Sequence, residues 1–476
     1  MFLNVILLYL VVLLAAGYWR SRSVRTSDDF LVAGRTLPAR VLIFTLLSTW
    51  IGSGSLFAGA GLGYREGFSA LWQSAGAWVG IAFVYFLAPR ARRLAQYTVP
   101  DVLELRYGPV ARVLGTIVTV LAYTAIAAYQ FRGGGRLLNL VAGVDPQTGA
   151  LVTAAVCVTY TALAGMLAIA YLDVGNGLVM IAAVTAAVIA LVGESGGLGT
   201  ALAALGPEQV SLWGTMTPLQ ALGLFLPTMF LLMGEANMYQ KFFSARDERA
   251  ARWAVVGWIV GTIVVETLID SVGVFGSLQV TGLDAAASEA IVVRVAIDAL
   301  PVALGLLLVC GAAAIVVSTA NSFLLTPATN LVRDVYQRFI NPQATDRQLL
   351  VYTRVMVVLL GAAGFIALGF FQTILQMALW AYTMYGAGIT PALLAALAWR
   401  RATRLAGVLS ILAGMLTTLG WEIAGMVMAT EGAGPVYPLG LQTVYPALLL
   451  SIATLVIVSL ITPPPSRDDL APFRLA

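Results

Sequence analysis

The chain has 476 residues, of which 60% are hydrophobic and only 11% are charged. A soluble chain has about 25% charged residues, so a surface this poor in charge would not stay dispersed in water. Histidine is absent, which excludes His-ligated zinc, histidine phosphorelays and Ser-His-Asp catalysis. The net charge of +4 is too small to indicate nucleic-acid binding. Both cysteines, Cys157 and Cys310, lie in apolar runs. The composition indicates an all-α polytopic membrane protein.

Apolar stretches of roughly 20 residues, long enough to cross a bilayer, recur along the whole chain. We expect about 13 transmembrane helices, at about 1–19, 38–62, 67–89, 109–140, 149–165, 172–192, 218–240, 253–278, 301–327, 350–370, 374–397, 405–428 and 441–461. The first stretch lacks a basic leader and a small-residue cleavage site, which favours a retained helix over a signal peptide. Every loop is short, so we expect no soluble domain.

Basic residues gather in alternate loops, and this asymmetry predicts the orientation. Most of the 27 Lys and Arg residues fall on one side, in clusters such as Arg20–Arg25, Arg90–Arg93 and Arg400–Arg404. Loops of the opposite side hold Arg65 and Arg294. Because the basic side is cytoplasmic, we expect a multi-pass protein of the plasma (inner) membrane with its N-terminus outside and its C-terminus inside.

Two predicted spans are interrupted. The second contains Ser48-Thr49-Trp50-Ile51-Gly52-Ser53-Gly54-Ser55, and the seventh contains Gly234-Glu235-Ala236-Asn237. Polar and glycine residues at membrane depth are tolerated where freed carbonyls line a polar cavity. Two breaks five spans apart favour an inverted-repeat transporter with a site near the midplane. Close helix packing through small residues is the alternative interpretation.

Five motifs, in this order, resemble those of the sodium/solute symporter family. They are Asp29-Phe30-Leu31-Val32-Ala33-Gly34-Arg35, Thr49-Trp50-Ile51-Gly52, Tyr160-Thr161-Ala162-Leu163-Ala164-Gly165 with Leu172-Asp173-Val174, Tyr239-Gln240-Lys241 with Ser244-Ala245-Arg246-Asp247, and Ser318-Thr319-Ala320-Asn321-Ser322 with Asp334-Val335-Tyr336. The resemblance runs from about 28 to 400. It implies a LeuT-type fold, a 5+5 inverted repeat core with broken first and sixth core helices.

The resemblance also implies a division of the chain into five parts. Residues 1–37 form an extra N-terminal helix and a cytoplasmic link, and 38–192 form the first inverted repeat. Residues 193–217 form an extracellular loop, and 218–397 form the second repeat. Residues 398–476 add two C-terminal helices and a cytoplasmic tail.

Adjacent hydroxyls in an apolar helix, Ser318 and Thr319, suggest a sodium site. Sodium takes about five or six oxygen ligands, and neutral carbonyls and hydroxyls suit an exchangeable ion. Such hydroxyls also often bond their own helix, so residue types leave both roles open. The family resemblance implies that sodium is bound by the carbonyls of Ser48, Ile51 and Ile315 and by the Ser318 and Thr319 side chains.

Asp173 lies near the cytoplasmic end of the sixth span, where a charged side chain can also reach water. The family places an aspartate here close to the sodium path. Its sialic-acid-transporting members bind a second sodium with this aspartate and two serines. Those two positions are Asn321 and Ser322 in this chain.

Ionisable residues within spans are candidates for function, and five stand out: Arg132, Glu235, Glu266, Asp270 and Glu422. Structural pairing of Arg132 with Glu235 or Asp270 remains an alternative. From the family we expect the substrate site to contain Ser55, Ser74, Arg132, Glu235 and Asp270. Trp50 joins them as a candidate for cation–π contact, with packing, the commoner role of tryptophan in such helices, as the alternative. The glutamine, asparagine and lysine set of sugar-transporting members is absent. A guanidinium at Arg132 suits a carboxylate, and the acids suit an amino group.

These features predict a sodium-coupled symporter that imports a small carboxylate-bearing or zwitterionic solute, such as an amino acid or a sugar acid like sialic acid, by alternating access. An importer of a cationic amine and a proton-coupled carrier of the same fold are the alternatives. We expect sodium as coupling ion, membrane lipid as surroundings, and neither a nucleic acid nor an obligate protein partner. Neither a catalytic dyad nor a metal centre can be assembled from these residues, so we do not expect an enzyme.

Overall fold

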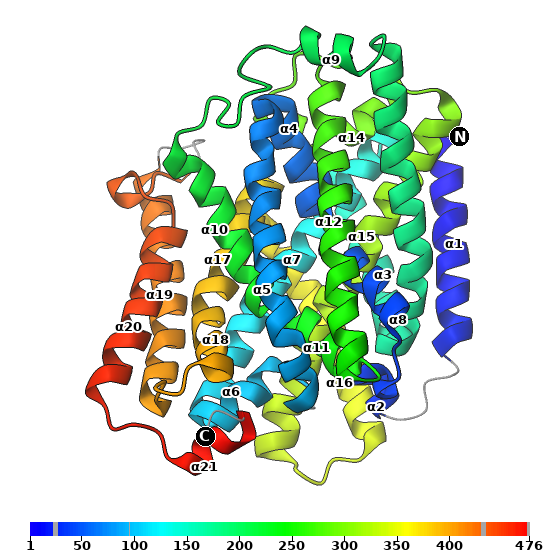
Figure 1. Cartoon of the computed structure of the whole chain (residues 1–476). Helices are drawn as coiled ribbons and strands as arrows, with labels where there is room; N and C mark the ends of the chain where they lie inside the picture. The colour runs from blue at the N-terminus through cyan, green and yellow to red at the C-terminus, as the bar shows by residue number, and fades with distance from the viewer. Residues whose placement is uncertain (22–26, 95, 430–434, 474–476) are drawn as a thin grey trace.

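The computed structural model describes residues 1–21, 27–94, 96–429 and 435–473. Arg22, Arg25 and Arg474, which the orientation argument counts among the basic residues of the cytoplasmic side, lie outside this part. Within it the chain forms helices and contains no strand, apart from one isolated bridge between Leu37 and Ala245. Figure 1 shows a bundle with α1 at one edge and α19 and α20 at the other, and with the two termini at opposite ends.

In chain order, one group of helices precedes the segment between α9 and α10 and a second group follows it. The first group contains α1 (Phe2–Ser21), α2 (Ser27–Val32), η1 (Ala33–Arg35), α3 (Ala39–Trp50), η2 (Gly54–Gly59), α4 (Ala60–Glu66), η3 (Gly67–Ala70), α5 (Leu71–Leu94), α6 (Val99–Tyr107), α7 (Pro109–Ala142), α8 (Pro146–Glu194) and α9 (Leu198–Ala204). The second group contains α10 (Pro218–Gly234), α11 (Ala236–Ser244), α12 (Glu248–Gly276), α13 (Ala285–Ser288), α14 (Ile291–Arg294), η4 (Val295–Ala299), α15 (Val302–Asn330), η5 (Leu331–Ile340), α16 (Asp346–Ala367), η6 (Leu368–Phe370), α17 (Ile374–Gly388), α18 (Thr390–Ala398), α19 (Arg404–Met428), η7 (Pro438–Gly440), α20 (Val444–Ile461), α21 (Arg467–Leu470) and η8 (Ala471–Phe473).

Both predicted breaks are present. Helix α3 ends at Trp50, Ile51 has an extended backbone with ψ 101°, and the chain resumes as the π-helical η2 at Gly54. Helix α10 ends at Gly234, Glu235 is extended with ψ 119°, and α11 begins at Ala236. The prediction of a helical membrane protein with two broken core helices is therefore confirmed.

The predicted number of thirteen crossings is not confirmed. Within the described residues, ten helical segments are long and apolar enough to cross a membrane. The second and third predicted spans share the continuous helical stretch Gly54–Leu94, and the fifth and sixth together form α8. Helix α1 has 20 residues, whereas α3 has 12 and ends at the break, beyond which the chain continues as η2 and α4. The count differs because neighbouring predicted spans are joined by kinks or short turns within continuous helical stretches, each of which counts as one segment.

Helix α8 turns at Gly165, whose φ of +67° and ψ of 171° are open to glycine but strained for other residues. A Cβ at this position would also lie 2.5 Å from Cδ2 of Phe30. Beyond the kink α8 packs against α3 and α15, and α15 also packs against α7. This packing places the break of α3 next to α15.

A cluster of charged residues joins α6, α7 and η5 at the end of the bundle that holds the C-terminus (Figure 1). Arg112 pairs with Asp101 at 2.5 Å, with Glu104 at 2.5 Å and with Asp334 at 2.7 Å, and Arg338 pairs with Glu104 at 2.8 Å. Burial alone would raise the pKa of Glu104, but the hydrogen bonds from the two arginines hold that pKa below its ordinary value. We call these five residues the Arg112 cluster.

Candidate functional site

Two hydroxyls of α15 meet two carbonyls at the broken end of α3. Ser318 donates from Oγ to the Ser48 carbonyl at 3.1 Å, and Thr319 donates from Oγ1 to the Ile51 carbonyl at 2.9 Å. Ile315, the fifth predicted sodium ligand, is buried one turn earlier on α15. A Cβ at Gly52 would lie 2.8 Å from Cγ2 of Thr319, so glycine is what allows this approach. The arrangement gathers neutral oxygens that suit a monovalent cation.

Asp173 lies directly beside these oxygens. Its Oδ1 accepts a hydrogen bond from Ser318 at 2.5 Å, and its Oδ2 accepts one from Thr45 at 2.6 Å. The Ser48 hydroxyl donates to the Asp173 backbone carbonyl at 2.9 Å. The carboxylate is buried and supplies a negative charge next to the predicted sodium ligands, which favours a cation there.

The other two residues predicted for a second sodium have different partners. The Asn321 amide oxygen accepts from Thr161 at 2.9 Å. The Ser322 hydroxyl lies 2.9 Å from that of Thr49. Lys241 donates to the hydroxyl of Thr49, and its Nζ lies 3.5 Å from that of Ser322. The sequence analysis used Lys241 only as part of a motif. The structure buries Lys241 completely in α11, and a buried lysine in a membrane helix is a candidate for function.

Glu235 occupies the break between α10 and α11 and is completely buried. Its Oε1 accepts from the Asn237 amide at 3.3 Å, whereas its Oε2 has no hydrogen-bond partner. Beside it, Tyr385 donates to the Gly234 carbonyl at 2.9 Å. One carboxylate oxygen is therefore available to a ligand or a proton.

Two further acids, Glu266 and Asp270, lie one helical turn apart on α12. Glu266 accepts from the indoles of Trp50 at 2.8 Å and Trp78 at 2.9 Å, and from Ser55 at 3.4 Å. Asp270 accepts from Ser74 at 3.0 Å. Four of the predicted substrate residues are thus linked through these two acids, and Glu266 and Trp78 join them although neither was in the predicted set. We call these six residues the Glu266 group: Trp50, Ser55, Ser74, Trp78, Glu266 and Asp270.

Arg132 does not contact the Glu266 group. Its Nη2 donates to the backbone carbonyls of Leu368 at 2.5 Å and Phe371 at 2.8 Å, where η6 ends. It forms no ion pair with Glu235 or Asp270 among the described residues, so the structure does not show the alternative pairing either. Its guanidinium instead faces a cavity of about 640 Å³ that Arg136 and Arg294 also line.

Two buried donors beside the broken helix have no partner. The Oε1 atom of Gln130 on α7 accepts a hydrogen bond from the Ser53 backbone N–H at 2.8 Å. The Nε2 atom of Gln130 and the Ser53 hydroxyl have no hydrogen-bond partner. The hydroxyls of Tyr129 and Tyr382 lie 3.2 Å apart near Gly54, where a Cβ would be 2.6 Å from the Tyr382 hydroxyl. Sequence reasoning missed Gln130 and both tyrosines because polar residues are common in helices that pack together.

The two interrupted helices bring acids, hydroxyls and backbone carbonyls together inside the bundle. This arrangement defines a secondary transporter rather than an enzyme. The model of the "Sodium:solute symporter family" matches residues 30–415, and the chain belongs to this family.

Similar proteins agree with this class. The osmoregulated proline transporter OpuE of Bacillus subtilis is 24% identical, with 98% of this chain and 96% of that protein covered. The sodium/pantothenate symporter of Escherichia coli is 26% identical, with 93% of each covered. A sodium-coupled sialic acid symporter structure matches with a TM-score of 0.81 at 15% identity, covering 97% of this chain and 98% of that one. MhsT in complex with L-phenylalanine matches with a TM-score of 0.55 at 16% identity, covering 88% and 97%.

The fold is therefore of the LeuT type, as the sequence predicted. The protein is a sodium-coupled solute symporter integral to the plasma membrane.

Proposed function

We propose that one sodium ion binds between α3 and α15 and that its gradient drives import of a small polar organic solute by alternating access. The carbonyls of Ser48, Ile51 and Ile315 and the hydroxyls of Ser318 and Thr319 are its ligands. The observation that carries this proposal is the direct contact of the two hydroxyls with the Ser48 and Ile51 carbonyls. A sodium ion entering there replaces these hydrogen bonds with ion–oxygen contacts.

A second sodium at Asp173, Asn321 and Ser322 is less well supported. The ammonium of Lys241 contacts Ser322 and already supplies a fixed positive charge there. Two cations at this depth would repel each other strongly. We therefore propose a stoichiometry of one sodium per cycle. A Hill coefficient of about 1 for sodium-dependent uptake is expected, and a value near 2 would require the second ion.

For the solute, we propose a zwitterion or an amino-bearing organic acid. Glu266 and Asp270, with the faces of Trp50 and Tyr382, suit an ammonium group, and these two rings lie 5.9 Å apart. The unpartnered Ser53 hydroxyl and Gln130 amide suit a carboxylate next to the start of η2. The relatives that transport proline and pantothenate, and the sialic acid symporter, take carboxylate-bearing solutes, which supports this class.

A cationic amine remains the second candidate, since Arg132 is occupied by backbone carbonyls and the central charges are mostly acidic. A proton-coupled carrier is the third, with Glu235 as proton acceptor because one of its oxygens is unpartnered. For orientation, we propose an outside N-terminus and a cytoplasmic C-terminus, supported by the arginine-rich loops.

The test is a thermal-shift screen of the purified protein against proline, other amino acids, pantothenate, sialic acid and simple amines, in sodium and in potassium buffer. Binding to the folded state raises the melting temperature, so one screen reports both the solute and the ion. We expect a zwitterion or an amino-bearing organic acid to stabilise the protein only when sodium is present. Stabilisation by amines alone would favour the second candidate, and equal stabilisation in both buffers would contradict sodium coupling.

A further inference from the structure

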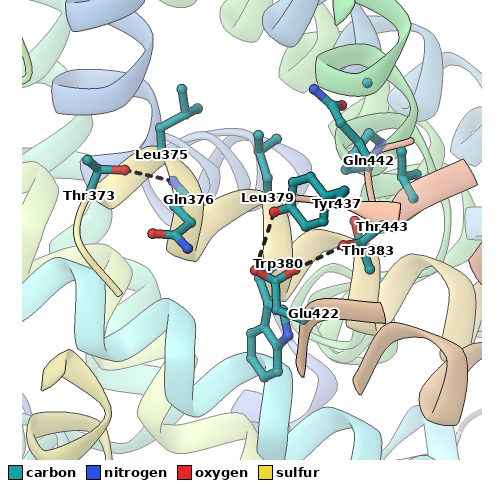
Figure 2. Close-up of a pocket in the computed structure, with 13 residues that line it drawn as sticks. Thr373, Leu375, Gln376, Leu379, Trp380, Thr383, Glu422, Tyr437, Gln442 and Thr443 are labelled. Carbon is teal, nitrogen blue, oxygen red and sulfur yellow. Dashed lines mark hydrogen bonds between the residues drawn. The ribbon is translucent and has the colours of Figure 1, made fainter. Parts of the chain in front are cut away.

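A cavity of about 210 Å³ lies outside the central site, between α10, α17, α19 and the start of α20 (Figure 2). Gly223 and Pro227 on α10 form one wall, and Trp380 and Thr383 on α17 form another. Glu422 on α19 projects into the space from the third side, as Figure 2 shows. Neither the sodium ligands nor the Glu266 group lines this cavity.

Within the described residues, the acceptors in this cavity are paired only with neutral groups or have no partner. Glu422 is only 3% exposed and accepts from the hydroxyls of Tyr437 at 3.3 Å and Thr443 at 2.9 Å. The Gln376 side chain also hydrogen-bonds to Glu422. No basic side chain pairs with Glu422 in the part of the chain that the structure describes. The Gln442 side-chain oxygen is buried there without a partner. A carboxylate at membrane depth without a cation is costly, so the cavity favours a positively charged ligand.

The walls indicate what kind of cation fits. Trp380 and Tyr437 present aromatic rings beside the carboxylate, and such rings attract organic ammonium groups. A second, apolar cavity of about 360 Å³ shares Trp380 and Glu422 with the first and continues between Leu419, Ile423 and neighbouring residues. Glu422 therefore lines both cavities and supplies a carboxylate among largely apolar walls, which suits an ammonium group carried on a short hydrocarbon body.

We propose that Glu422 and its surroundings form a second binding site, which takes a small alkylammonium ion. The ammonium lies against Glu422 and the Gln442 oxygen, and the hydrocarbon part lies against Trp380 and the apolar cavity. The proposal does not depend on which solute the central site transports.

Helix α17 connects this site with the centre of the molecule. Trp380 and Thr383 line the cavity, whereas Tyr382 lies near Trp50 at a ring separation of 5.9 Å and contacts the Tyr129 hydroxyl. A ligand in the cavity therefore touches the same helix that contacts the broken α3.

Calorimetry with n-butylammonium chloride on the purified full-length protein tests the proposal, with n-butyrate as the probe of opposite charge. We expect saturable binding of the amine and none of the acid. Glu422→Gln keeps the shape and the hydroxyl contacts but removes the charge, and should weaken amine binding by at least about tenfold. Glu194→Gln, an isosteric change at an exposed acid outside the cavity, should leave it unchanged.

Two further variants keep the result interpretable. A Cβ at Gly223 would lie 1.5 Å from the Gln442 side-chain oxygen, so Gly223→Ala should push that side chain into the cavity and weaken binding even if Glu422→Gln does not fold. Glu266→Gln removes the charge of a central acid that also suits an ammonium group, so amine binding that survives in Glu266→Gln and is lost in Glu422→Gln takes place at this cavity. Absence of saturable binding to the wild type, equal affinity in Glu422→Gln, or loss of binding in Glu266→Gln would each overturn the proposal.

Discussion

Ser318 and Thr319 form hydrogen bonds across to another helix, which separates them from the ordinary hydroxyls of α15. Thr329 on the same helix donates to the Leu325 carbonyl four residues earlier, as membrane threonines often do. The double change Ser318→Ala and Thr319→Ala should reduce sodium affinity by at least about tenfold, because it removes two of about five ligands. Thr329→Ala is the matched control and should keep the wild-type affinity. Sodium titration of the melting temperature is the measurement, and unchanged affinity in the double variant would remove this site from the mechanism.

We propose that Asp173 supplies charge to the sodium site rather than contact with the solute, since its carboxylate accepts from Ser318 and Thr45. Asp173→Asn keeps the shape and removes the charge. We expect sodium affinity to fall while the order of preference among solutes stays the same, because the substituted carboxylate contacts sodium ligands and not the Glu266 group. Competition uptake assays at several sodium concentrations measure both quantities. A changed solute preference at unchanged sodium affinity would show that the assignment is wrong.

For Arg132 the structure leads us to expect a role in stability, whereas the sequence suggested a role in binding a carboxylate. Because its guanidinium binds the Leu368 and Phe371 carbonyls, Arg132→Ala should lower the free energy of unfolding by about 2 kcal/mol. Glu235→Gln should leave stability nearly unchanged, and the double variant should show additive effects because the two side chains do not pair. Melting curves of the three variants decide this. Recovery of stability in the double variant would instead indicate an ion pair, and loss of carboxylate binding by folded Arg132→Ala would return this residue to the solute site.

The sequence allowed some of these residues to be predicted as site residues and not others. Ser318 and Thr319 stand out as adjacent hydroxyls in an apolar helix, but only the family resemblance favoured a sodium site over hydrogen bonds within their own helix. The surroundings of Arg132 and Lys241 were not predictable, because the depth of a residue in a span does not specify which neighbouring helix its side chain meets. Glu266 was recognised as a buried acid, but its indole partners come from α3 and α5, far away in the sequence.

At the scale of helices, the two breaks were predictable because glycine and polar residues at membrane depth are costly unless the backbone there lines a polar cavity. The division of α8 was predictable as well, because the fifth predicted span ends at 165, where Gly165 has a φ of +67°. The sequence did not show that the chain stays helical on both sides of this kink, so that no loop separates the two spans.

Gly165 is therefore expected to tolerate substitution poorly. Gly165→Ala forces a residue with a Cβ to a φ of +67° and brings that Cβ within 2.5 Å of the Phe30 ring. A loss of about 1–3 kcal/mol in stability is expected from the backbone conformation alone. Gly175→Ala lies on the same helix with open space around the added Cβ and should be neutral or slightly stabilising. Thermal unfolding of both variants tests this, and equal melting temperatures would show that the kink relaxes without cost.

At the scale of the whole molecule, the sequence predicted the class and the family because several motifs occur in the right order over most of the chain. The packing between distant segments was not predictable in the same way. The Arg112 cluster joins residues more than two hundred positions apart, and nothing in the local sequence links Asp334 to Arg112. The cavity at Glu422 likewise depends on separate segments of the chain meeting.

The Arg112 cluster also has a consequence for how tightly the protein holds sodium. Under the alternating access proposed above, we infer that opening of the C-terminal end of the bundle separates α6, α7 and η5, and three carboxylates around one guanidinium resist that separation. Arg112→Met should therefore populate the conformation open at that end, and only the remaining fraction would bind sodium from the other side with full affinity. Apparent sodium affinity should fall severalfold although no sodium ligand is changed. Arg93→Met, which breaks an exposed pair with Glu248, provides the comparison and should have no such effect. By the same linkage, saturating sodium should make a cysteine introduced beside Asp334 less reactive, so that a thiol reagent applied at one end of the bundle reports an ion bound in its middle.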